Sequence, residues 1–258
     1  MEGKRWFLVN ASPDLPRQIE SAPELQPIPD TDRNTPIEAV FLTNGDLDHV
    51  LGLFSLREGG PLKIYATSAV RVTVTECLGL DAVLDVFCGA AWQEPPFAQL
   101  SPLVVVDGEP RLLYRALALE GKAPPYARGN SIDGIHSVAY EFVDARTAGR
   151  LLVAPDVGVV NDALREALSN STAVLFDGTF WSADELARHK ASATTANEMG
   201  HVTIKDCSLE LLRKSAACHR IYIHINNTNP ILAPDAPERA LVEAAGIVVG
   251  SDGFEFEV

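Results

Sequence analysis

The sequence predicts an α/β fold in which two β-sheets pack together with helices on their outer faces. Three observations lead to this class. Apolar, β-prone runs recur along the chain, and several of them are followed by helical patterns. Antiparallel strands are expected first and strand–helix alternation afterwards, an order that fits a sandwich of two sheets. The chain has 258 residues, of which 47% are hydrophobic, so a substantial core is available to one large α/β domain or two small ones.

In the first half of the chain, short predicted strands alternate with helical segments. The run Glu-Ala-Val-Phe-Leu-Thr over residues 38–43 is typical of a buried strand, and the pattern then changes to helical periodicity. Proline and aspartate mark a loop before it. The predicted strands cover residues 6–10, 38–43 and 63–66, the predicted helices cover a short segment after Asp14, 49–56 and 67–78, and the loop covers 27–36.

The second half predicts a longer series of strands. Two of them, over residues 103–107 and 112–119, are expected to pair with each other. Ser182 and Glu185 have the spacing of a capping box that opens a helix through His189. The remaining predicted strands cover 136–142, 150–156, 172–177 and 220–224, the remaining helices cover 161–168, 209–217 and 237–245, and a closing hairpin is centred on 251–253.

Charge and composition exclude several classes of function. The formal net charge of −14 argues against nucleic acid and against an anionic membrane as partners. The sequence has no apolar stretch of the ~18 residues that a spanning helix needs. The start lacks the apolar region of a signal peptide, which predicts a cytoplasmic protein. The four cysteines form no Cys-x-x-Cys pair, so buried reduced thiols are expected.

The most informative segment is Asn-x-Asp-x-Asp-His over residues 44–49. It resembles the metal-binding loop His-x-His-x-Asp-His of metallo-β-lactamase-fold proteins, with Asn44 and Asp46 in place of the two leading histidines. Asp48 and His49 retain the remaining ligands. A polar segment between a strand and a helix lies at the carboxyl edge of a sheet, where α/β proteins commonly place their chemistry. Taken alone, the segment could equally be an Asp/Asn-rich capped turn.

Later strands end in the same way, which favours a metal site over a simple turn. Predicted strands lead to Asp156, to Asp177 and to His224. Two aspartates and two histidines from separate loops can form the ligand shell of one ion. Carboxylate and imidazole ligands suit zinc, manganese or ferrous iron, and two histidines with one carboxylate are the pattern of iron oxygenases.

Several motifs together identify a family. The chain resembles the pyrroloquinoline quinone biosynthesis protein B family, a branch of the metallo-β-lactamase fold. The resemblance implies an αββα four-layer sandwich built as a single domain over residues 1–258. It also implies that the N-terminal strand of the fold, with a cysteine-rich segment, is missing here, through truncation or in a shorter relative. The matching motifs run in order along the chain: LVNASPD at 8–14, LTNGDLDHVLGL at 42–53, VAPD at 153–156, DGTFW at 177–181, MGH at 199–201 and HINNTNPIL at 224–232.

The resemblance assigns metal ligands position by position. Asp48, His49, Asp156 and His224 match the ligands of one metal position, and Asp46 is expected to join them or to hold a ligand in place. The other metal position would need histidines where Asn44, Asp46 and Lys122 stand. A charged lysine cannot ligate a cation and repels it, so one divalent metal is expected rather than two.

The remaining candidates are catalytic or bind substrate. His201 has the place of a proton-transfer histidine in related hydrolases, and its alternative is a histidine satisfied by backbone groups. Asp177 is expected to orient His201 or a ligand, or to cap the following loop. Lys122 and Asn44 are the candidate substrate-binding residues, because an ammonium group suits a substrate carboxylate. The alternative for Lys122 is a solvated loop lysine.

The resemblance implies a role in making pyrroloquinoline quinone (PQQ), with a Glu-Tyr-containing peptide precursor or PQQ itself as partner. The favoured interpretation is a metal-dependent oxidoreductase that hydroxylates the tyrosine ring, with iron favoured and zinc as the alternative cofactor. A non-catalytic carrier for PQQ or its precursor and a mononuclear zinc hydrolase are the other two interpretations. Self-association into a homodimer is left open by the sequence.

Overall fold

The structure is a computed structural model that describes residues 5–27, 34–127, 132–189 and 193–258. The chain divides into two compact units. Unit 1 comprises Met1–Pro95 and Lys122–Ser137, and unit 2 comprises Pro96–Gly121 and Val138–Val258. Each unit has its own sheet and its own hydrophobic core. That the whole chain acts as a single domain stays a prediction.

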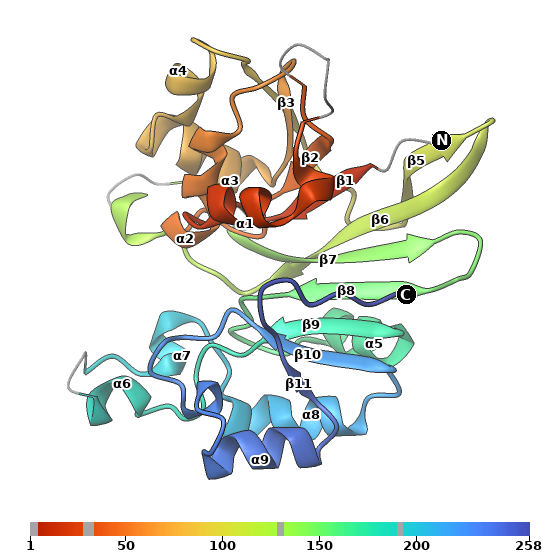
Figure 1. Cartoon of the computed structure of the whole chain (residues 1–258). Helices are drawn as coiled ribbons and strands as arrows, with labels where there is room; N and C mark the ends of the chain where they lie inside the picture. Colours follow the sequence, from red (N-terminus) through yellow and green to blue (C-terminus); the bar gives the residue numbers. More distant parts are fainter. Residues whose placement is uncertain (1–4, 28–33, 128–131, 190–192) are drawn as a thin grey trace. The chain divides into compact units, whose positions relative to one another are not determined.

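Unit 1 is built on a four-stranded sheet with the order β1-β2-β3-β4, and all of its pairs are parallel (Figure 1). The expectation that antiparallel strands come first is therefore wrong. Parallel neighbours need crossover connections, and helical segments between the strands supply them. The strands are β1 (Trp6–Val9), β2 (Ile37–Phe41), β3 (Leu62–Tyr65) and β4 (Ala90–Gln93). The sequence did not predict β4.

The helical segments of unit 1 are short, and two of the α-helices pass directly into a 3₁₀ or a π-helical segment. The predicted helix over 49–56 is a turn of α-helix followed by a 3₁₀ segment. Gly52 lies in that segment, where an added Cβ would stand 2.3 Å from the carbonyl oxygen of Ser12, so only glycine fits. The segments are α1 (Leu15–Ser21), η1 (Pro23–Leu25), α2 (Leu47–Val50), η2 (Leu51–Ser55), α3 (Ser68–Val72), the π-helical η3 (Thr73–Cys77), α4 (Leu80–Leu84) and η4 (Pro125–Ala127). The predicted loop over 27–36 lies mostly outside the described residues.

Unit 2 contains a seven-stranded mixed sheet with the order β11-β10-β9-β8-β7-β6-β5. The pairs β5–β6 and β7–β8 are antiparallel, whereas β8, β9, β10 and β11 run parallel to one another. The predicted pairing of the two strands near residues 103 and 119 is confirmed. The strands are β5 (Ser101–Val106), β6 (Glu109–Leu119), β7 (Ser137–Asp144), β8 (Arg150–Ala154), β9 (Ala173–Asp177), β10 (His219–Ile223) and β11 (Val248–Val249).

Helices connect the parallel strands of unit 2 and pack on its core. Asn161 caps the N-terminus of α5, because its Oδ1 accepts the Leu164 N–H at 2.9 Å. The apolar face of α5 is buried. The segments are α5 (Asp162–Asn170), α6 (Glu185–Arg188), α7 (Ala196–Met199), the π-helical η5 (Ile204–Ser208), α8 (Leu209–Lys214), η6 (Pro230–Leu232) and α9 (Pro237–Ala244).

Two local predictions in unit 2 are wrong. Glu185 does not form a capping box with Ser182, because its buried carboxylate accepts the Trp181 N–H at 2.7 Å and the Thr228 hydroxyl at 2.6 Å. The capping box of this region is formed by Thr195 and Glu198 at the start of α7. The tail forms no hairpin around residues 251–253, because β11 pairs in parallel with β10 and no strand follows it in the described residues.

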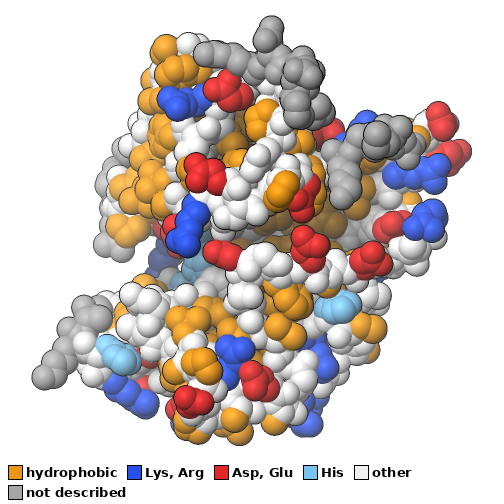
Figure 2. Space-filling view, in the orientation of Figure 1, with side chains coloured by type: hydrophobic (Ala, Val, Ile, Leu, Met, Phe, Trp, Pro, Cys, Tyr) orange, Lys and Arg blue, Asp and Glu red, His pale blue; other side chains and the backbone are white. Residues whose placement is uncertain are grey.

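The surface mixes both signs of charge with exposed apolar side chains (Figure 2). In unit 1, Val83, Val86 and Phe87 are exposed at the end of α4, and hydrophobic side chains gather over that segment. Among the residues that the structure describes, no helix has both the length and the apolar character to cross a bilayer.

Candidate functional site

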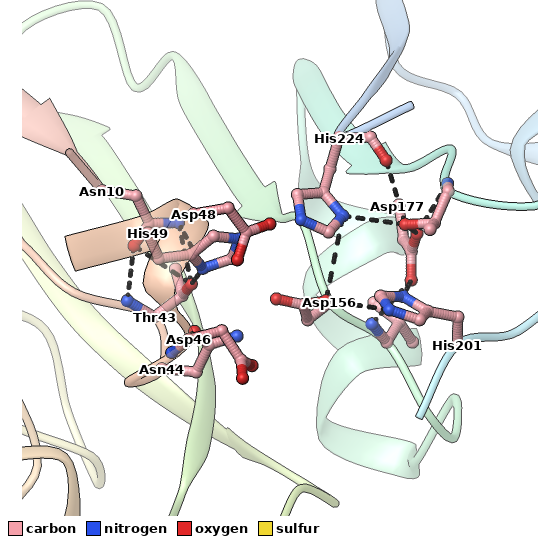
Figure 3. Close-up of polar contacts among 12 residues, drawn as sticks. Asn10, Thr43, Asn44, Asp46, Asp48, His49, Asp156, Asp177, His201 and His224 are labelled. Atoms are coloured by element: carbon pink, nitrogen blue, oxygen red, sulfur yellow. Dashed lines mark hydrogen bonds and ion pairs between the residues drawn. The ribbon is translucent and has the colours of Figure 1, made fainter. Parts of the chain in front are cut away.

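Polar side chains form one cluster in each unit, and most of them follow the carboxyl ends of parallel strands (Figure 3). Helices and loops leave a sheet at this edge, so polar side chains from several strands gather there. The unit 1 cluster comprises Asn10, Thr43, Asn44, Asp46, Asp48 and His49. The unit 2 cluster comprises Asp156, Asp177, Thr179, His201 and His224.

His49 is buried in the unit 1 cluster and is held through its Nδ1 nitrogen. Nδ1 lies 3.1 Å from Nδ2 of Asn10 and 3.2 Å from Oγ1 of Thr43. Asn10 is itself fixed, because its Oδ1 accepts the Thr43 N–H at 2.9 Å and its backbone adopts a φ of 63°. Asparagine tolerates this left-handed conformation better than most residues. An amide NH₂ group only donates, so Nδ1 of His49 accepts from Asn10, and these contacts fix the position of the ring.

The other members of the unit 1 cluster differ in exposure. The side chain of Asp48 is 60% exposed, and its Oδ2 lies 3.9 Å from Nε2 of His49. Asn44 is buried, and its Oδ1 accepts the Asp46 N–H at 3.0 Å, which closes an Asx turn. Asn44 therefore shapes the loop that carries Asp46 and Asp48, and its role toward a substrate stays a prediction.

Tyr126 is a member of this region that the sequence did not indicate. Its hydroxyl donates a hydrogen bond to the carbonyl of Gly45. Burial, the charge of Asp46 and the nearby Cys77 raise the pKa of Tyr126 to about 12. Tyr126 therefore stays protonated near neutral pH and acts as a hydrogen-bond donor to the loop. Lys122 lies in the preceding loop and is exposed, and its role in substrate binding stays a prediction.

Asp177 is the centre of the unit 2 cluster. It is fully buried, and its Oδ2 accepts the Val157 N–H at 2.9 Å and the Nδ1–H of His201 at 2.8 Å. Its Oδ1 accepts the N–H of Thr179 at 2.9 Å and the Thr179 hydroxyl at 2.6 Å. Four donors use the lone pairs of both oxygens, so Asp177 orients its neighbours and is not available as a ligand. Its bond to Val157 also fixes the backbone beside Asp156.

His201 combines burial with two carboxylate neighbours. Its Nδ1 donates to Asp177, and its Nε2 lies 3.4 Å from Oδ1 of Asp156. Burial lowers the pKa of His201, but the hydrogen bond and charge of Asp177 and the charge of Asp156 outweigh it, and the net result is a raised pKa. An imidazole held by one carboxylate and directed toward another can carry a proton at Nε2 or ligate a metal there.

His224 completes the unit 2 cluster from the loop after β10. Its Nδ1 lies 2.8 Å from the hydroxyl of Thr179 and 3.9 Å from Oδ1 of Asp156, and its ring stacks on His201 with centroids 5.6 Å apart. One possible ligand atom from each of Asp156, His201 and His224 lies within 4.8 Å of the others. Two imidazoles and one carboxylate at this spacing fit a divalent transition metal.

The motif HINNTNPIL explains how His224 is positioned. Asn229 is buried and donates from Nδ2 to the carbonyls of Gly178 at 2.8 Å and Thr179 at 3.3 Å. Thr228 donates to Glu185 at 2.6 Å. These bonds join the loop after β10 to the loop after β9, so the asparagine-rich motif is structural support for the cluster.

Within each unit, the structure brings together most of the residues predicted for the site. Asp156, Asp177 and His224 gather in unit 2, as their strand ends predicted, and His201 joins them from the segment after α7. Asn10 and Thr179 belong to the motifs at 8–14 and 177–181, but the sequence does not indicate their contacts with His49 and His224. Three other histidines have structural surroundings: His136 contacts the carbonyl of Ile132, His189 is exposed, and His219 packs against Phe256.

The strand orders of the two sheets, together with carboxylate and imidazole side chains near the strand ends, are typical of one class of protein fold. The model of the β-lactamase superfamily domain matches residues 5–225. A diphosphatase of the PhnP family matches with a TM-score of 0.62 over 97% of this chain and 78% of that chain, and its 17% identity shows the fold alone. The chain therefore has the metallo-β-lactamase fold that its sequence predicted.

More similar relatives narrow this class to one family. Coenzyme PQQ synthesis protein B of Pseudomonas aeruginosa strain LESB58 is 37% identical over 268 residues, which cover 100% of this chain and 85% of that protein. The same protein of Azotobacter vinelandii is 37% identical over 261 residues, with the same coverage. The crystal structure of zinc-bound PqqB from Methylobacterium extorquens matches with a TM-score of 0.85 and 32% identity, over 100% of this chain and 85% of that chain. The chain belongs to the coenzyme PQQ synthesis protein B family.

Proposed function

We propose that this protein acts in PQQ biosynthesis as a metal-dependent oxidoreductase that hydroxylates the tyrosine ring of a Glu-Tyr-containing precursor. The observation that carries the proposal is the unit 2 cluster, in which Asp156 and His224 offer a carboxylate and an imidazole to a metal and His201 lies beside them. With His49 as the second imidazole, the proposed ligands include the two histidines and one carboxylate that iron oxygenases use. Membership in the PQQ synthesis family supports the pathway.

The proposed cofactor is one divalent metal, with iron favoured over zinc. The proposed ligands are Asp48, His49, Asp156 and His224, with Asp46 as a further ligand or a support. A relative that is 32% identical has been crystallised with zinc, which supports a divalent metal in this family. When bound, a ferrous ion supplies the one-electron chemistry that oxygen activation requires.

The residues of the chain supply orientation and proton transfer. His201 is proposed to hold or move a proton at Nε2, because Asp177 fixes its Nδ1 and raises its pKa. Lys122 and Asn44 are proposed to bind the carboxylates of the substrate. Ring hydroxylation inserts one oxygen atom into a C–H bond and releases the other as water, so an external two-electron reductant is needed.

Purification without oxygen, followed by loading with ferrous iron or zinc, tests the proposal. With a Glu-Tyr peptide, oxygen and a reductant, the iron-loaded protein should consume oxygen and yield a peptide that has gained one oxygen atom. The same reaction with His224→Ala is the control. No oxygen uptake and no oxidised peptide with iron-loaded protein would overturn the hydroxylase proposal.

A mononuclear zinc hydrolase is the second candidate, and the zinc in the crystallised relative favours it. A bound zinc ion lowers the pKa of its water and so provides a nucleophile for peptide or ester cleavage. Cleavage of the peptide by zinc-loaded protein, without oxygen uptake, would favour this candidate. Binding of PQQ or the peptide without any turnover would instead identify a carrier.

A further inference from the structure

We propose that Thr179 is a positioning residue that fixes the ring tautomer of His224 and connects both histidines of unit 2 to Asp177. The hydroxyl oxygen of Thr179 has three polar neighbours at short range. They are Oδ1 of Asp177 at 2.6 Å, Nδ1 of His224 at 2.8 Å and the carbonyl oxygen of His224 at 2.9 Å. The residue is 6% exposed, so water does not dominate these contacts.

The tautomer follows from counting hydrogens. A threonine hydroxyl has one hydrogen to donate and two lone pairs. Two of the three neighbours, the Asp177 carboxylate and the His224 carbonyl, are oxygens that can only accept. If the hydroxyl donated to Nδ1 of His224, the carboxylate oxygen would lie 2.6 Å from another oxygen with no hydrogen between them.

The hydroxyl hydrogen is therefore directed to an oxygen, and the short charge-assisted contact with Asp177 is the stronger of the two. Nδ1 of His224 at 2.8 Å must then be the donor, with its hydrogen directed at the Thr179 oxygen. The neutral ring of His224 thus carries its proton on Nδ1. Its Nε2 presents a lone pair, which is what a metal ligand needs.

His201 is oriented in the same sense by the same carboxylate. Its Nδ1 donates directly to the other oxygen of Asp177 at 2.8 Å. One buried carboxylate thus orients two imidazoles, His201 directly and His224 through Thr179. Both rings are therefore held at Nδ1 by the hydrogen bonds of this carboxylate and of Thr179.

The backbone around Thr179 holds its hydroxyl in this geometry. Its N–H donates to Asp177, and its carbonyl accepts the Asn226 N–H at 3.2 Å and the Asn229 side chain at 3.3 Å. His224 has a positive φ of 55°, an uncommon conformation for a non-glycine residue. The loop bonds of Asn229 therefore support both partners of the Thr179–His224 contact.

The test compares Thr179→Val, which keeps the shape and removes the hydroxyl, with Thr179→Ser, which keeps the hydroxyl. Nitrogen-15 NMR of the metal-free protein reports the tautomer of each histidine ring. Wild type and Thr179→Ser should show His224 protonated on Nδ1, and Thr179→Val should lose that preference. Zinc affinity, measured by calorimetry, should fall about 10- to 100-fold in Thr179→Val and recover in Thr179→Ser.

Thr203→Val is the matched control, because Thr203 is equally buried in unit 2 and its hydroxyl donates to Asp206 at 3.1 Å. It should leave the His224 tautomer unchanged. His224 protonated on Nε2 in the wild-type protein, or an unchanged tautomer in Thr179→Val, would overturn the inference. The wild-type spectrum decides the matter even if Thr179→Val does not fold.

The expected change in zinc affinity rests on the proposed function, whereas the expected tautomer of His224 does not. If the wild-type protein bound no metal, the proposed function would be wrong. The NMR measurement would still test the role of Thr179 in fixing the tautomer of His224. An Nε2-protonated His224 in a protein that binds iron would remove only the role of Thr179.

Discussion

The two clusters hold their histidines with different chemistry. In unit 1, the Nδ1 of His49 contacts a neutral amide and a neutral hydroxyl, from Asn10 and Thr43. In unit 2, a buried carboxylate, Asp177, holds His201 directly and His224 through Thr179. Neutral support fixes a ring without adding charge, whereas carboxylate support also favours the protonated or metal-bound ring. This difference suggests that unit 2 tunes the chemistry, while unit 1 contributes mainly geometry.

Replacing Asp177 with Asn should have the largest effect. An amide has one acceptor oxygen and one NH₂ group, so its nitrogen must face the donors of either Val157 and His201 or Thr179. Buried donors without acceptors should reduce the free energy of unfolding by about 3 kcal/mol or more. Urea denaturation measures this loss, and calorimetry should show a loss of metal binding. Unchanged stability and affinity would mean that Asp177 does not organise the cluster.

Removing either proposed histidine ligand should have the next largest effect. His49→Ala and His224→Ala should each reduce metal affinity beyond the roughly 10- to 100-fold that loss of a supporting residue causes. Asn44→His should change metal stoichiometry little, because Asp46 and Lys122 remain at the other metal position. His201→Ala should retain the metal and slow the reaction. Metal loss in His201→Ala would instead make His201 a ligand, as its distance from Asp156 allows.

Asn10→Asp should convert the neutral support of His49 into the carboxylate type of unit 2. Aspartate also tolerates the positive φ at this position. The new carboxylate should accept the Nδ1–H of His49 and raise its pKa, which an NMR titration of the metal-free protein would detect. Asn10→Ala, which removes the support, should instead lower metal affinity about tenfold. An unchanged pKa of His49 in Asn10→Asp would contradict the claim that the two units differ in how the charge of the supporting residue affects their histidines.

The smallest expected effect is the pH dependence of stability from His201. Its pKa is raised in the folded chain, so the folded protein binds more protons at this site than the unfolded chain does. This contribution is full below the unfolded pKa of about 6.5 and is lost as the pH rises through the folded value. Urea midpoints with a chelator present should therefore decrease over this range, and His201→Gln should flatten the decrease. An equal slope in both proteins would contradict the assignment.

Most of the site residues that the sequence could predict lie at the ends of predicted strands. Asp156, Asp177 and His224 each follow an apolar run, so their common sheet edge could be predicted from the pattern alone. The supporting residues could not, because Asn10 and Thr179 act across 39 and 45 residues of chain, respectively. A motif shows that a threonine is present but not which atom its hydroxyl contacts.

Tertiary contacts also explain the local errors. Glu185 has the spacing of a capping residue, but the loop containing Thr228 binds its carboxylate, and the local signal is overridden. Strand β4 has the sequence Ala-Ala-Trp-Gln, with no β-branched residue and no alternation of buried and exposed positions, so it carries little strand signal. The parallel order of β1–β4 depends on crossover connections that strand patterns alone do not define.

The most direct test of the account is to purify the protein without oxygen and to measure its binding of ferrous iron by calorimetry. The account predicts one iron per chain, and no comparable binding in His224→Ala. Absence of binding in the wild type, or equal binding in His224→Ala, would contradict a metal centre built on these imidazoles and carboxylates.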